Sequence, residues 1–156
     1  MVTASEDKLI KLWRSGCATN TLAGHSAGVT SLAVVSSTEF LSGSEDATIR
    51  RWSNDGHSLG KYSGGDSPIS SISLLKGGGW LTSGHDPFLH VWFNNKLAQT
   101  ISVSANNLIG STALPTGDIA AISSDGRIWM LTQNISKHSK DVLDVLGQSV
   151  TSALCG

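Results

Sequence analysis

The heptapeptide Asp46-Ala47-Thr48-Ile49-Arg50-Arg51-Trp52 has a counterpart on either side of it in the chain. Asp-Lys-Leu-Ile-Lys-Leu-Trp begins at Asp7 and Asp-Pro-Phe-Leu-His-Val-Trp begins at Asp86, so the three aspartates are 39 and 40 residues apart. A fourth aspartate, Asp125, follows 39 residues later; Leu131 stands where a tryptophan is expected, and Trp129 is two residues out of register. Matching flanks at one period of about 40 residues predict a repeat architecture.

Each period divides into short segments that alternate apolar and polar residues and are separated by turn-forming residues. The second repeat predicts strands at Val29–Val35, Glu39–Ser44, Thr48–Ser53 and Ser58–Tyr62. The third predicts Ile69–Leu75, Trp80–Gly84, Phe88–Phe93 and Leu97–Ser102, and the fourth Leu108–Leu114, Asp118–Ser123 and Arg127–Thr132. Four antiparallel strands in every 40 residues predict the blades of an all-β propeller.

The composition excludes several classes of protein. The chain has 156 residues and a formal net charge of -1, so it lacks the basic excess of a nucleic-acid-binding surface. No apolar run approaches the roughly 18 residues that cross a bilayer, and the N-terminus does not have the pattern of a signal peptide. The two cysteines, Cys17 and Cys155, form neither a metal motif nor a disulfide framework. We therefore expect no membrane and no nucleic-acid partner, and a cytoplasmic location with the nucleus as a second compartment.

The second repeat resembles a complete WD40 repeat in Gly24-His25, Ser42, Asp46 and Trp52. This resemblance implies that His25, Ser42, Asp46 and Trp52 form a buried hydrogen-bond relay, in which a buried carboxylate is tolerated because its acceptors are filled. The other repeats match in part. They retain Thr3, Asp7 and Trp13 in the first repeat, Thr82, Asp86 and Trp92 in the third with Gly65 in the place of histidine, and Asp125 alone in the fourth, with Ser104 and Leu131 in the other places.

The ends of the chain predict a partial propeller. The first repeat begins at its second strand, and the residues after Thr132 do not alternate. Residues 139–154 have the apolar spacing of a short amphipathic helix that Gly147 interrupts, so the last blade should hold only three strands. We therefore expect about three and a half four-stranded antiparallel blades in residues 1–132, the C-terminal half of a larger propeller, and a tail with a short helix in residues 133–156.

A catalytic role is not predicted. His25, Ser42 and Asp46 have the composition of a hydrolytic triad, but the repeat accounts for all three and the chain has no Gly-x-Ser-x-Gly elbow. His85, Asp86 and His90 have no further Cys or His spaced for a metal site, and residues 77–79 lack the Lys-Ser/Thr of a phosphate-binding loop. We expect no catalytic, cofactor or metal residues; an enzyme would need a pocket with perturbed titratable groups.

Several short motifs resemble the propeller of the phospholipase A-2-activating protein family over residues 1–132. They are Leu32–Ser42 with Asp46–Trp52, Leu97–Ile101, Asn107–Ile109, Gly117–Ala121 and Ser124-Asp125-Gly126. The resemblance implies a ubiquitin-binding adaptor that acts with an AAA unfoldase, valosin-containing protein, in ubiquitin-dependent protein turnover and recycling. It also implies that the propeller contacts ubiquitin and that unfoldase docking belongs to a domain absent from this chain.

Partner contacts are expected on the turn before each repeat aspartate and on the loop that enters each inner strand, because function concentrates on loops held by a rigid scaffold. The candidates are Glu6, Thr30, Glu45, Ser70, His85, Asn107, Ile109 and Ser124. Ubiquitin binds through an apolar face with a basic rim, which Ile109, Glu6 and Glu45 would complement. The alternative function is a generic WD40 scaffold for another peptide or protein. Exposed blade edges would also favour self-association.

Overall fold

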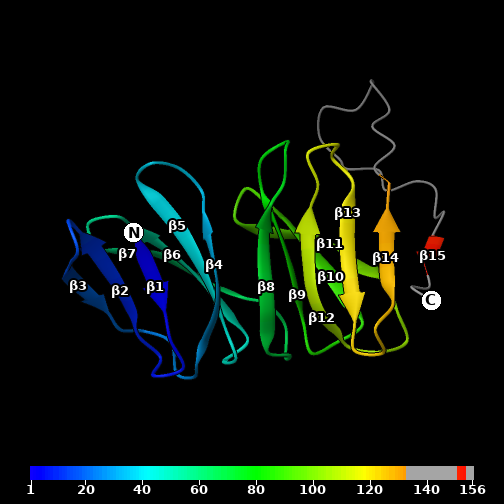
Figure 1. Cartoon of the computed structure of the whole chain (residues 1–156), viewed down its shortest axis with the longest axis horizontal. Helices are drawn as coiled ribbons and strands as arrows, with labels where there is room; N and C mark the ends of the chain where they lie inside the picture. Colours follow the sequence, from blue (N-terminus) through cyan, green and yellow to red (C-terminus); the bar gives the residue numbers. More distant parts are fainter. Residues whose placement is uncertain (133–150, 154–156) are drawn as a thin grey trace.

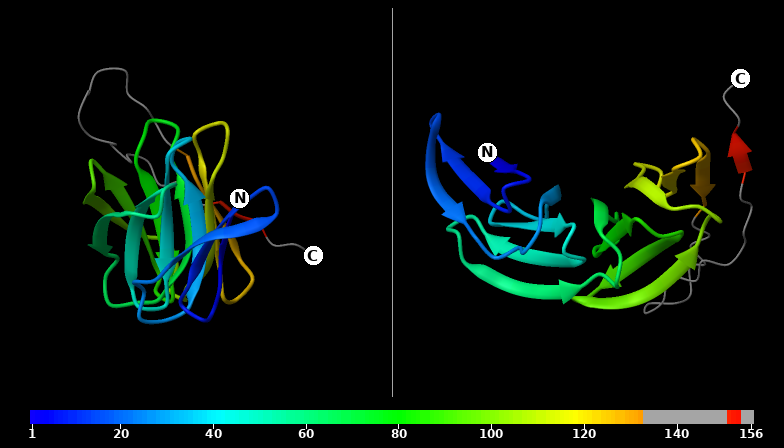
Figure 2. Two further views of the ribbon diagram at one scale, coloured as in Figure 1. Left: turned by 90° about the vertical axis from the view of Figure 1, so that its left-hand side faces the viewer. Right: turned by 90° about the horizontal axis from the view of Figure 1, so that it is seen from below.

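The computed structural model describes residues 1–132 and 151–153, which form antiparallel sheets placed side by side in a crescent (Figure 1, Figure 2). The first sheet contains β1 (Val2–Ala4), β2 (Ile10–Arg14) and β3 (Cys17–Leu22). The second contains β4 (Val29–Val34), β5 (Glu39–Ser44), β6 (Thr48–Ser53) and β7 (Ser58–Ser63), and the third β8 (Ile69–Leu74), β9 (Trp80–Gly84), β10 (Phe88–Phe93) and β11 (Lys96–Ser102). The fourth contains β12 (Leu108–Ala113), β13 (Ile119–Ser123), β14 (Ile128–Leu131) and β15 (Thr151–Ala153). The predicted all-β class is confirmed, and we call these sheets blades 1 to 4.

The strand bounds follow the alternation in the sequence closely. The observed bounds of β5, β6, β9 and β10 are the predicted ones, and the other predicted strands differ by one residue at one end, or at both ends for β14. The turn after the repeat aspartate needs a left-handed residue in three blades: Lys8, Ala47 and Gly126 have φ of 73°, 61° and 82°. In blade 3 this residue is Pro87, whose ring holds φ near -65°, so that turn is built differently.

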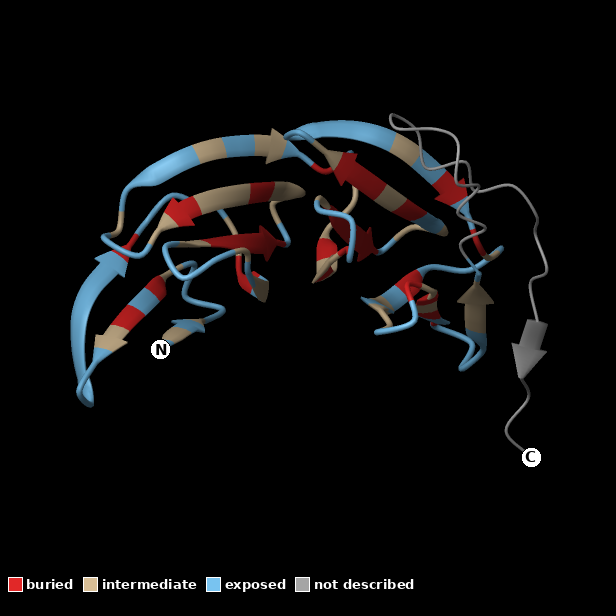
Figure 3. Ribbon diagram, turned by 90° about the horizontal axis from the view of Figure 1, so that it is seen from above, coloured by how far each residue is buried: buried red, intermediate tan, exposed pale blue. Residues whose placement is uncertain are grey.

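Apolar side chains from neighbouring blades form the core. Ile10 and Leu12 of blade 1 pack with Phe40 and Trp52 of blade 2. Between blades 2 and 3, Leu41 and Ile49 pack with Trp80 and Trp92. Between blades 3 and 4, Leu81 and Leu89 pack with Ile119 and Ala121. Figure 3 shows buried residues mainly on the middle strands of the blades, such as β5 and β9, and exposed residues along the convex edge, where β7 and β11 lie. Each blade therefore depends on its neighbours for burial.

The last blade differs from the prediction. β15 pairs with β14 through Ile128↔Ala153, Trp129↔Ser152 and Met130↔Thr151, so blade 4 has a fourth strand and the expected three-stranded blade is wrong. The predicted helix over 139–154 lies mostly outside the described residues, and the part that is described, Thr151–Ala153, is this strand. A ladder of backbone hydrogen bonds does not require alternating side chains, which is why the sequence pattern missed it. The division of the chain at residue 132 stays a prediction.

Candidate protein-binding face

Blade 2 contains a continuous side-chain network that ties the loop before β4 to β5 and β6. Nδ1 of His25 lies 3.1 Å from Oδ2 of Asp46, and its Nε2 lies 2.8 Å from Oγ of Ser42. Nε1 of Trp52 donates to the same Ser42 oxygen at 2.8 Å. All donors are satisfied when His25 is neutral, with Nδ1–H donating to Asp46 and Nε2 accepting the hydroxyl hydrogen of Ser42. The four residues therefore join three segments of one blade.

The carboxylate of Asp46 is the most heavily bonded group in this network. It also accepts the backbone N–H of Ser26 at 2.8 Å and, from Thr48, the N–H at 3.0 Å and the hydroxyl at 2.6 Å. Burial alone would raise the pKa of Asp46, but the bonds from Thr48, Ser26 and His25 outweigh burial and hold that pKa well below its usual range. Burial lowers the pKa of His25, although Asp46 opposes the shift. The pair is therefore a carboxylate bonded to a neutral imidazole.

Blades 1 and 3 hold only part of this network. Nε1 of Trp13 donates to Thr3 at 2.9 Å, and Nε1 of Trp92 donates to Thr82 at 3.1 Å. The aspartates are bonded to few groups: Asp7 accepts the N–H of Leu9 at 3.0 Å, and Asp86 accepts the N–H of Phe88 at 3.0 Å. In blade 3, where a loop histidine is missing, Nε2 of His90 lies 3.5 Å from Oδ2 of Asp86. A strand histidine thus lies near Asp86, but its Nε2 makes no hydrogen bond within the described residues and does not replace the loop histidine.

Blade 4 builds a related network in which Asp125 and Trp129 are joined by two residues that the sequence analysis did not single out, Asn106 and Ser123. Nε1 of Trp129 donates to Oγ of Ser123 at 3.2 Å, and the Ser123 hydroxyl donates to Asp125. Nδ2 of Asn106 donates to Asp125 at 3.0 Å, and Ser123 reaches the carboxylate directly, whereas His25 bridges Ser42 and Asp46 in blade 2. Ser123 and Trp129 each lie two residues closer to the repeat aspartate than Ser42 and Trp52 do in blade 2. They remain diagonal neighbours on the same face of the sheet. In the sequence, the signal for this network is that Ser123 and Trp129 are displaced by the same two residues.

The candidate contact residues lie at one end of the sheets, the lower edge in Figure 1. Within blades 2, 3 and 4 the turn before the aspartate donates a backbone bond to the loop that enters the inner strand: Glu45 N–H to Gly28, His85 N–H to Pro68 and Ser124 N–H to Asn107. Between blades, the N–H of Val29 bonds to Ser5 and that of Leu108 bonds to Asp86. Because these bonds run within and between blades, the loops form one rigid rim.

Three of the candidates share a special backbone position. The register between inner and second strands shifts at Thr30, Ser70 and Ile109, which are the bulged residues of β4, β8 and β12. A bulge changes the direction of its side chain and is common beside functional sites. The Thr30 hydroxyl donates to the carbonyls of Gly43 and Ile69, and the Ser70 hydroxyl donates to the carbonyl of Ser83. Ile109 is 50% exposed and offers an apolar side chain to a partner.

Two acidic candidates meet where blade 1 joins blade 2. Glu6 and Glu45 are both exposed and lie on either side of Gly28. A Cβ at Gly28 would lie 3.2 Å from the Glu45 carboxylate and 3.4 Å from the Glu6 backbone, so glycine lets both residues approach this point closely. The remaining candidates, His85, Asn107 and Ser124, are exposed along blades 3 and 4. The rim is thus acidic at one end and apolar, at Ile109, at the other.

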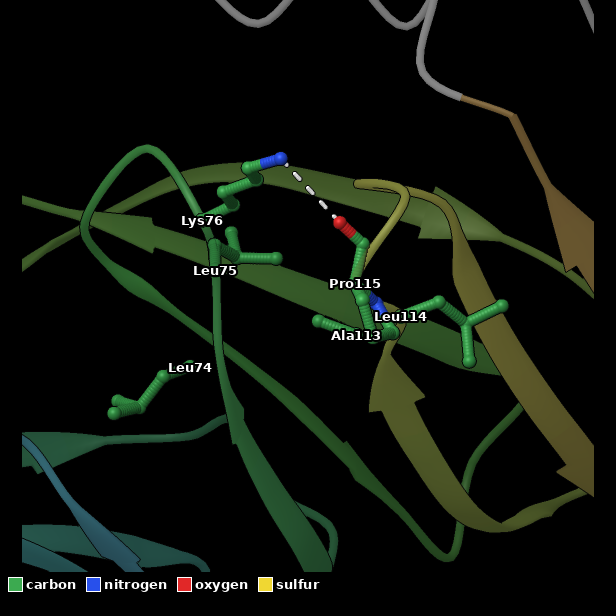
Figure 4. Close-up of a pocket in the computed structure, with 6 residues that line it drawn as sticks. All are labelled: Leu74, Leu75, Lys76, Ala113, Leu114 and Pro115. Atoms are coloured by element: carbon green, nitrogen blue, oxygen red, sulfur yellow. Dashed lines mark hydrogen bonds between the residues drawn. The ribbon is translucent and has the colours of Figure 1, made fainter.

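A shallow groove lies at the opposite end of the sheets, between the hairpins of blades 3 and 4 (Figure 4). Leu74, Leu75, Ala113, Leu114 and Pro115 line it, and the ammonium of Lys76 donates to the Pro115 carbonyl at 3.4 Å. None of the relay or candidate contact residues lines this groove. In the part of the chain that the structure describes, no cluster of His, Cys, Asp and Glu is arranged to hold a metal ion, and no helix is long and apolar enough to cross a membrane.

Comparisons with known proteins agree with this geometry. Residues 16–53 match the family "WD domain, G-beta repeat", a span that runs from the outer strand of blade 1 through β6 of blade 2. The ubiquitin homeostasis protein lub1 of Schizosaccharomyces pombe is 30% identical over 94 residues, which are 60% of this chain and 13% of that protein. The crystal structure of the WD40 β-propeller domain of Doa1 superposes with a TM-score of 0.80 at 33% identity.

That superposition covers 86% of this chain and 47% of the Doa1 chain, so the chain spans about half the length of that structure. The matched WD repeat contains the complete His25–Ser42–Asp46–Trp52 network, and the four sheets repeat its blade geometry. The chain therefore contains a WD40 repeat and folds as a partial WD40 β-propeller.

Proposed function

We propose that this chain is a non-catalytic protein-binding module whose partner is ubiquitin or a ubiquitinated protein. The observation that carries the proposal is the rim: exposed side chains on turns and loops that backbone hydrogen bonds hold in one rigid surface. Rigid loops on a scaffold lose little conformational entropy when they bind. The likeness to a protein of ubiquitin homeostasis and to the Doa1 propeller supports ubiquitin as the partner.

The rim offers chemistry that complements ubiquitin. Ile109 would contact the apolar face of ubiquitin, and Glu6 and Glu45 would attract its basic border. His85, Asn107 and Ser124 add exposed donors and acceptors between these two ends. A small number of apolar and polar contacts of this kind predicts a weak and rapidly reversible complex. Action with an AAA unfoldase is part of the same proposal, but we assign no unfoldase contact to these residues.

Titration of isotope-labelled ubiquitin with the unlabelled chain, followed by NMR, tests the proposal. We expect fast-exchange shifts on the apolar face of ubiquitin, and we expect Ile109→Ser and the pair Glu6→Ala with Glu45→Ala each to reduce the affinity. Leu97→Ser is the matched control, because Leu97 is also about half exposed, at 49%, but lies on the outer strand β11. The absence of shifts at millimolar concentration of the folded chain would remove ubiquitin as the partner.

The alternative of a generic WD40 scaffold makes a different prediction in the same experiment. It predicts that ubiquitin signals stay unchanged while the rim variants still lose a different protein partner in a pull-down. Equal binding by the rim variants and the native chain would instead move the binding surface away from the rim, toward the groove between the hairpins of blades 3 and 4 (Figure 4).

A further inference from the structure

Two cations lie directly opposite each other on the outer strands of blade 2. Arg50 of β6 is paired with Lys61 of β7 in the strand register, so their side chains share one face of the sheet. In blades 1 and 3 the outer residue at this position is instead a threonine, Thr21 or Thr100. Like charges directly opposite on neighbouring strands destabilise a sheet. Blade 2 therefore carries an electrostatic cost that blades 1 and 3 do not have.

Carboxylates of the described residues do not neutralise this cation pair. The cations that form ion pairs in this part of the chain are Arg14, His25, Arg51, His90 and Arg127. Nε of Arg50 is buried and has no hydrogen-bond partner among the described residues. The face that holds the pair meets blade 1, whose outer strand β3 is described as fully as β7 is. The neighbouring strands thus leave the positive charge unbalanced.

The guanidinium of Arg50 is held in place by packing against two groups. A Cβ at Gly24 would lie 2.8 Å from Nη1 of Arg50 and 3.0 Å from its Cζ, so the guanidinium lies directly against the loop before β4. Its Cζ is also 5.9 Å from the centre of the Trp52 ring, a cation–π distance. A cation fixed in this way loses little conformational entropy when an anion binds. Arg50 is therefore a preorganised, half-buried cation beside the exposed Lys61.

We propose that Arg50 and Lys61 form a second binding surface, which takes the carboxylates of an acidic peptide segment of a partner protein. Arginine binds a carboxylate through directed N–H bonds, and lysine attracts one as a point charge. A bound carboxylate also removes the repulsion between the two cations, so the free chain favours binding. The surface lies on β6 and β7, whereas the rim consists of turns and loops, so the inference does not depend on the partner of the rim.

The position of the cation pair favours an extended segment over a small anion. β7 is the edge strand of its sheet and lies along the exposed convex edge (Figure 3). Its free backbone groups can pair with an extended peptide, which would place a side chain next to Lys61. β3 and β11 are edge strands as well, but they lack a cation opposite a cation. The charge of blade 2 therefore selects an acidic segment for β7.

NMR titration of the 156-residue chain with a hexaglutamate peptide tests the proposal, with the Nε–H signal of Arg50 as the direct reporter. We expect this signal and the backbone amides of β7 to shift, with a Kd of about 1 mM or tighter at low ionic strength. Added salt should weaken the binding. Arg50→Gln and Lys61→Gln should each reduce the affinity about three- to fivefold, the effect of one partly exposed charge pair.

Three controls separate this surface from general attraction between charges. Lys11→Gln removes the cation at the position of Arg50 in blade 1, and Lys96→Gln removes one from the outer strand β11. Both variants should bind hexaglutamate as the native chain does, and so should the rim variant Ile109→Ser. Hexaglutamine, a peptide of the same length without charge, should leave the Arg50 signal unchanged. Circular dichroism confirms that each variant is folded.

Lys61→Glu provides a second test because it places a carboxylate opposite Arg50 within the chain. It should abolish binding of hexaglutamate and raise the Tm by about 1–4 °C, since repulsion across the strands becomes attraction. Lys96→Glu makes the same change of charge away from the pair and should do neither.

Three results would overturn the proposal. An Arg50 signal that does not shift at about 10 mM hexaglutamate would remove the site, since a specific contact would be populated there. Equal affinity of the native chain, Arg50→Gln and Lys61→Gln would place the binding of the peptide elsewhere. Inorganic phosphate that shifts the Arg50 signal at the same concentration as hexaglutamate would replace the peptide segment with a small anion.

Discussion

Replacing the repeat aspartate in blade 2 should cost far more stability than the same replacement in blade 3. Asp46 and Asp86 occupy the same position, and their side chains are only 6% and 17% exposed. Asp46 accepts bonds from His25, Ser26 and two groups of Thr48, whereas Asp86 accepts one backbone bond and lies 3.5 Å from His90. The four bonds accepted by Asp46, against one accepted by Asp86, are therefore the main source of the expected difference in cost.

The magnitude follows from the bonds that are lost. A bond to a charged group contributes about 1.5–3 kcal/mol, and a buried donor left unpaired costs about 1–3 kcal/mol. Asp46→Ala loses several such bonds and leaves the buried imidazole N–H of His25 without its acceptor, so we expect a cost of about 3–5 kcal/mol. Asp86→Ala removes one bond to a charged group, which costs about 1.5–3 kcal/mol. With each kcal/mol worth about 2–4 °C in a chain of this size, we expect Asp46→Ala to melt roughly 4–8 °C below Asp86→Ala.

Thermal unfolding by circular dichroism and urea unfolding by tryptophan fluorescence measure the two costs. Asp46→Asn keeps the size of the side chain and removes its charge, so it should lie between the native chain and Asp46→Ala. If Asp46→Ala and Asp86→Ala lose the same free energy of unfolding within about 0.5 kcal/mol, the network does not stabilise blade 2 in the way that its geometry indicates, and the reasoning is refuted.

Two further predictions concern the pH dependence of stability and the displaced network of blade 4. Because burial holds the pKa of His25 below its ordinary 6.5, the native state takes up a proton less readily than the unfolded chain does. The stability from neutral His25 is then complete above pH 6.5 and is lost as pH falls through the lowered native pKa, and a series of urea midpoints should show this loss in the native chain but not in His25→Asn. In blade 4, Ser123→Ala should cost about 1–3 kcal/mol because Trp129 loses its acceptor, whereas the exposed neighbour Ser124→Ala should change the free energy of unfolding by less than about 0.5 kcal/mol; equal effects in a melting experiment would contradict the displaced relay.

The sequence predicted the strands well because their signal is local. Alternation along β5, β6, β9 and β10 is visible in the residues themselves, and the repeat spacing places each strand in its blade. It predicted β15 wrongly because that strand is held by backbone bonds to β14, which leave no side-chain pattern. It also marked Thr30 and Ser70 as contact residues without indicating that their hydroxyls are bonded to carbonyls, which limits what they can offer a partner.

The sequence by itself determined the period of the repeat and the class of fold, because strand alternation recurs at a fixed spacing, and its resemblance to a WD40 repeat indicated the residues of the relay in blade 2. Only the tertiary structure decided how blade 4 compensates. Asn106 and Ser123 donate to Asp125, and Trp129 donates to Ser123, because folding brings a loop and two strands within reach of one another. A displacement of two residues keeps a side chain on the same face of a strand, so a network can move along a blade while its partners still meet, and spacing along the chain does not record such a move.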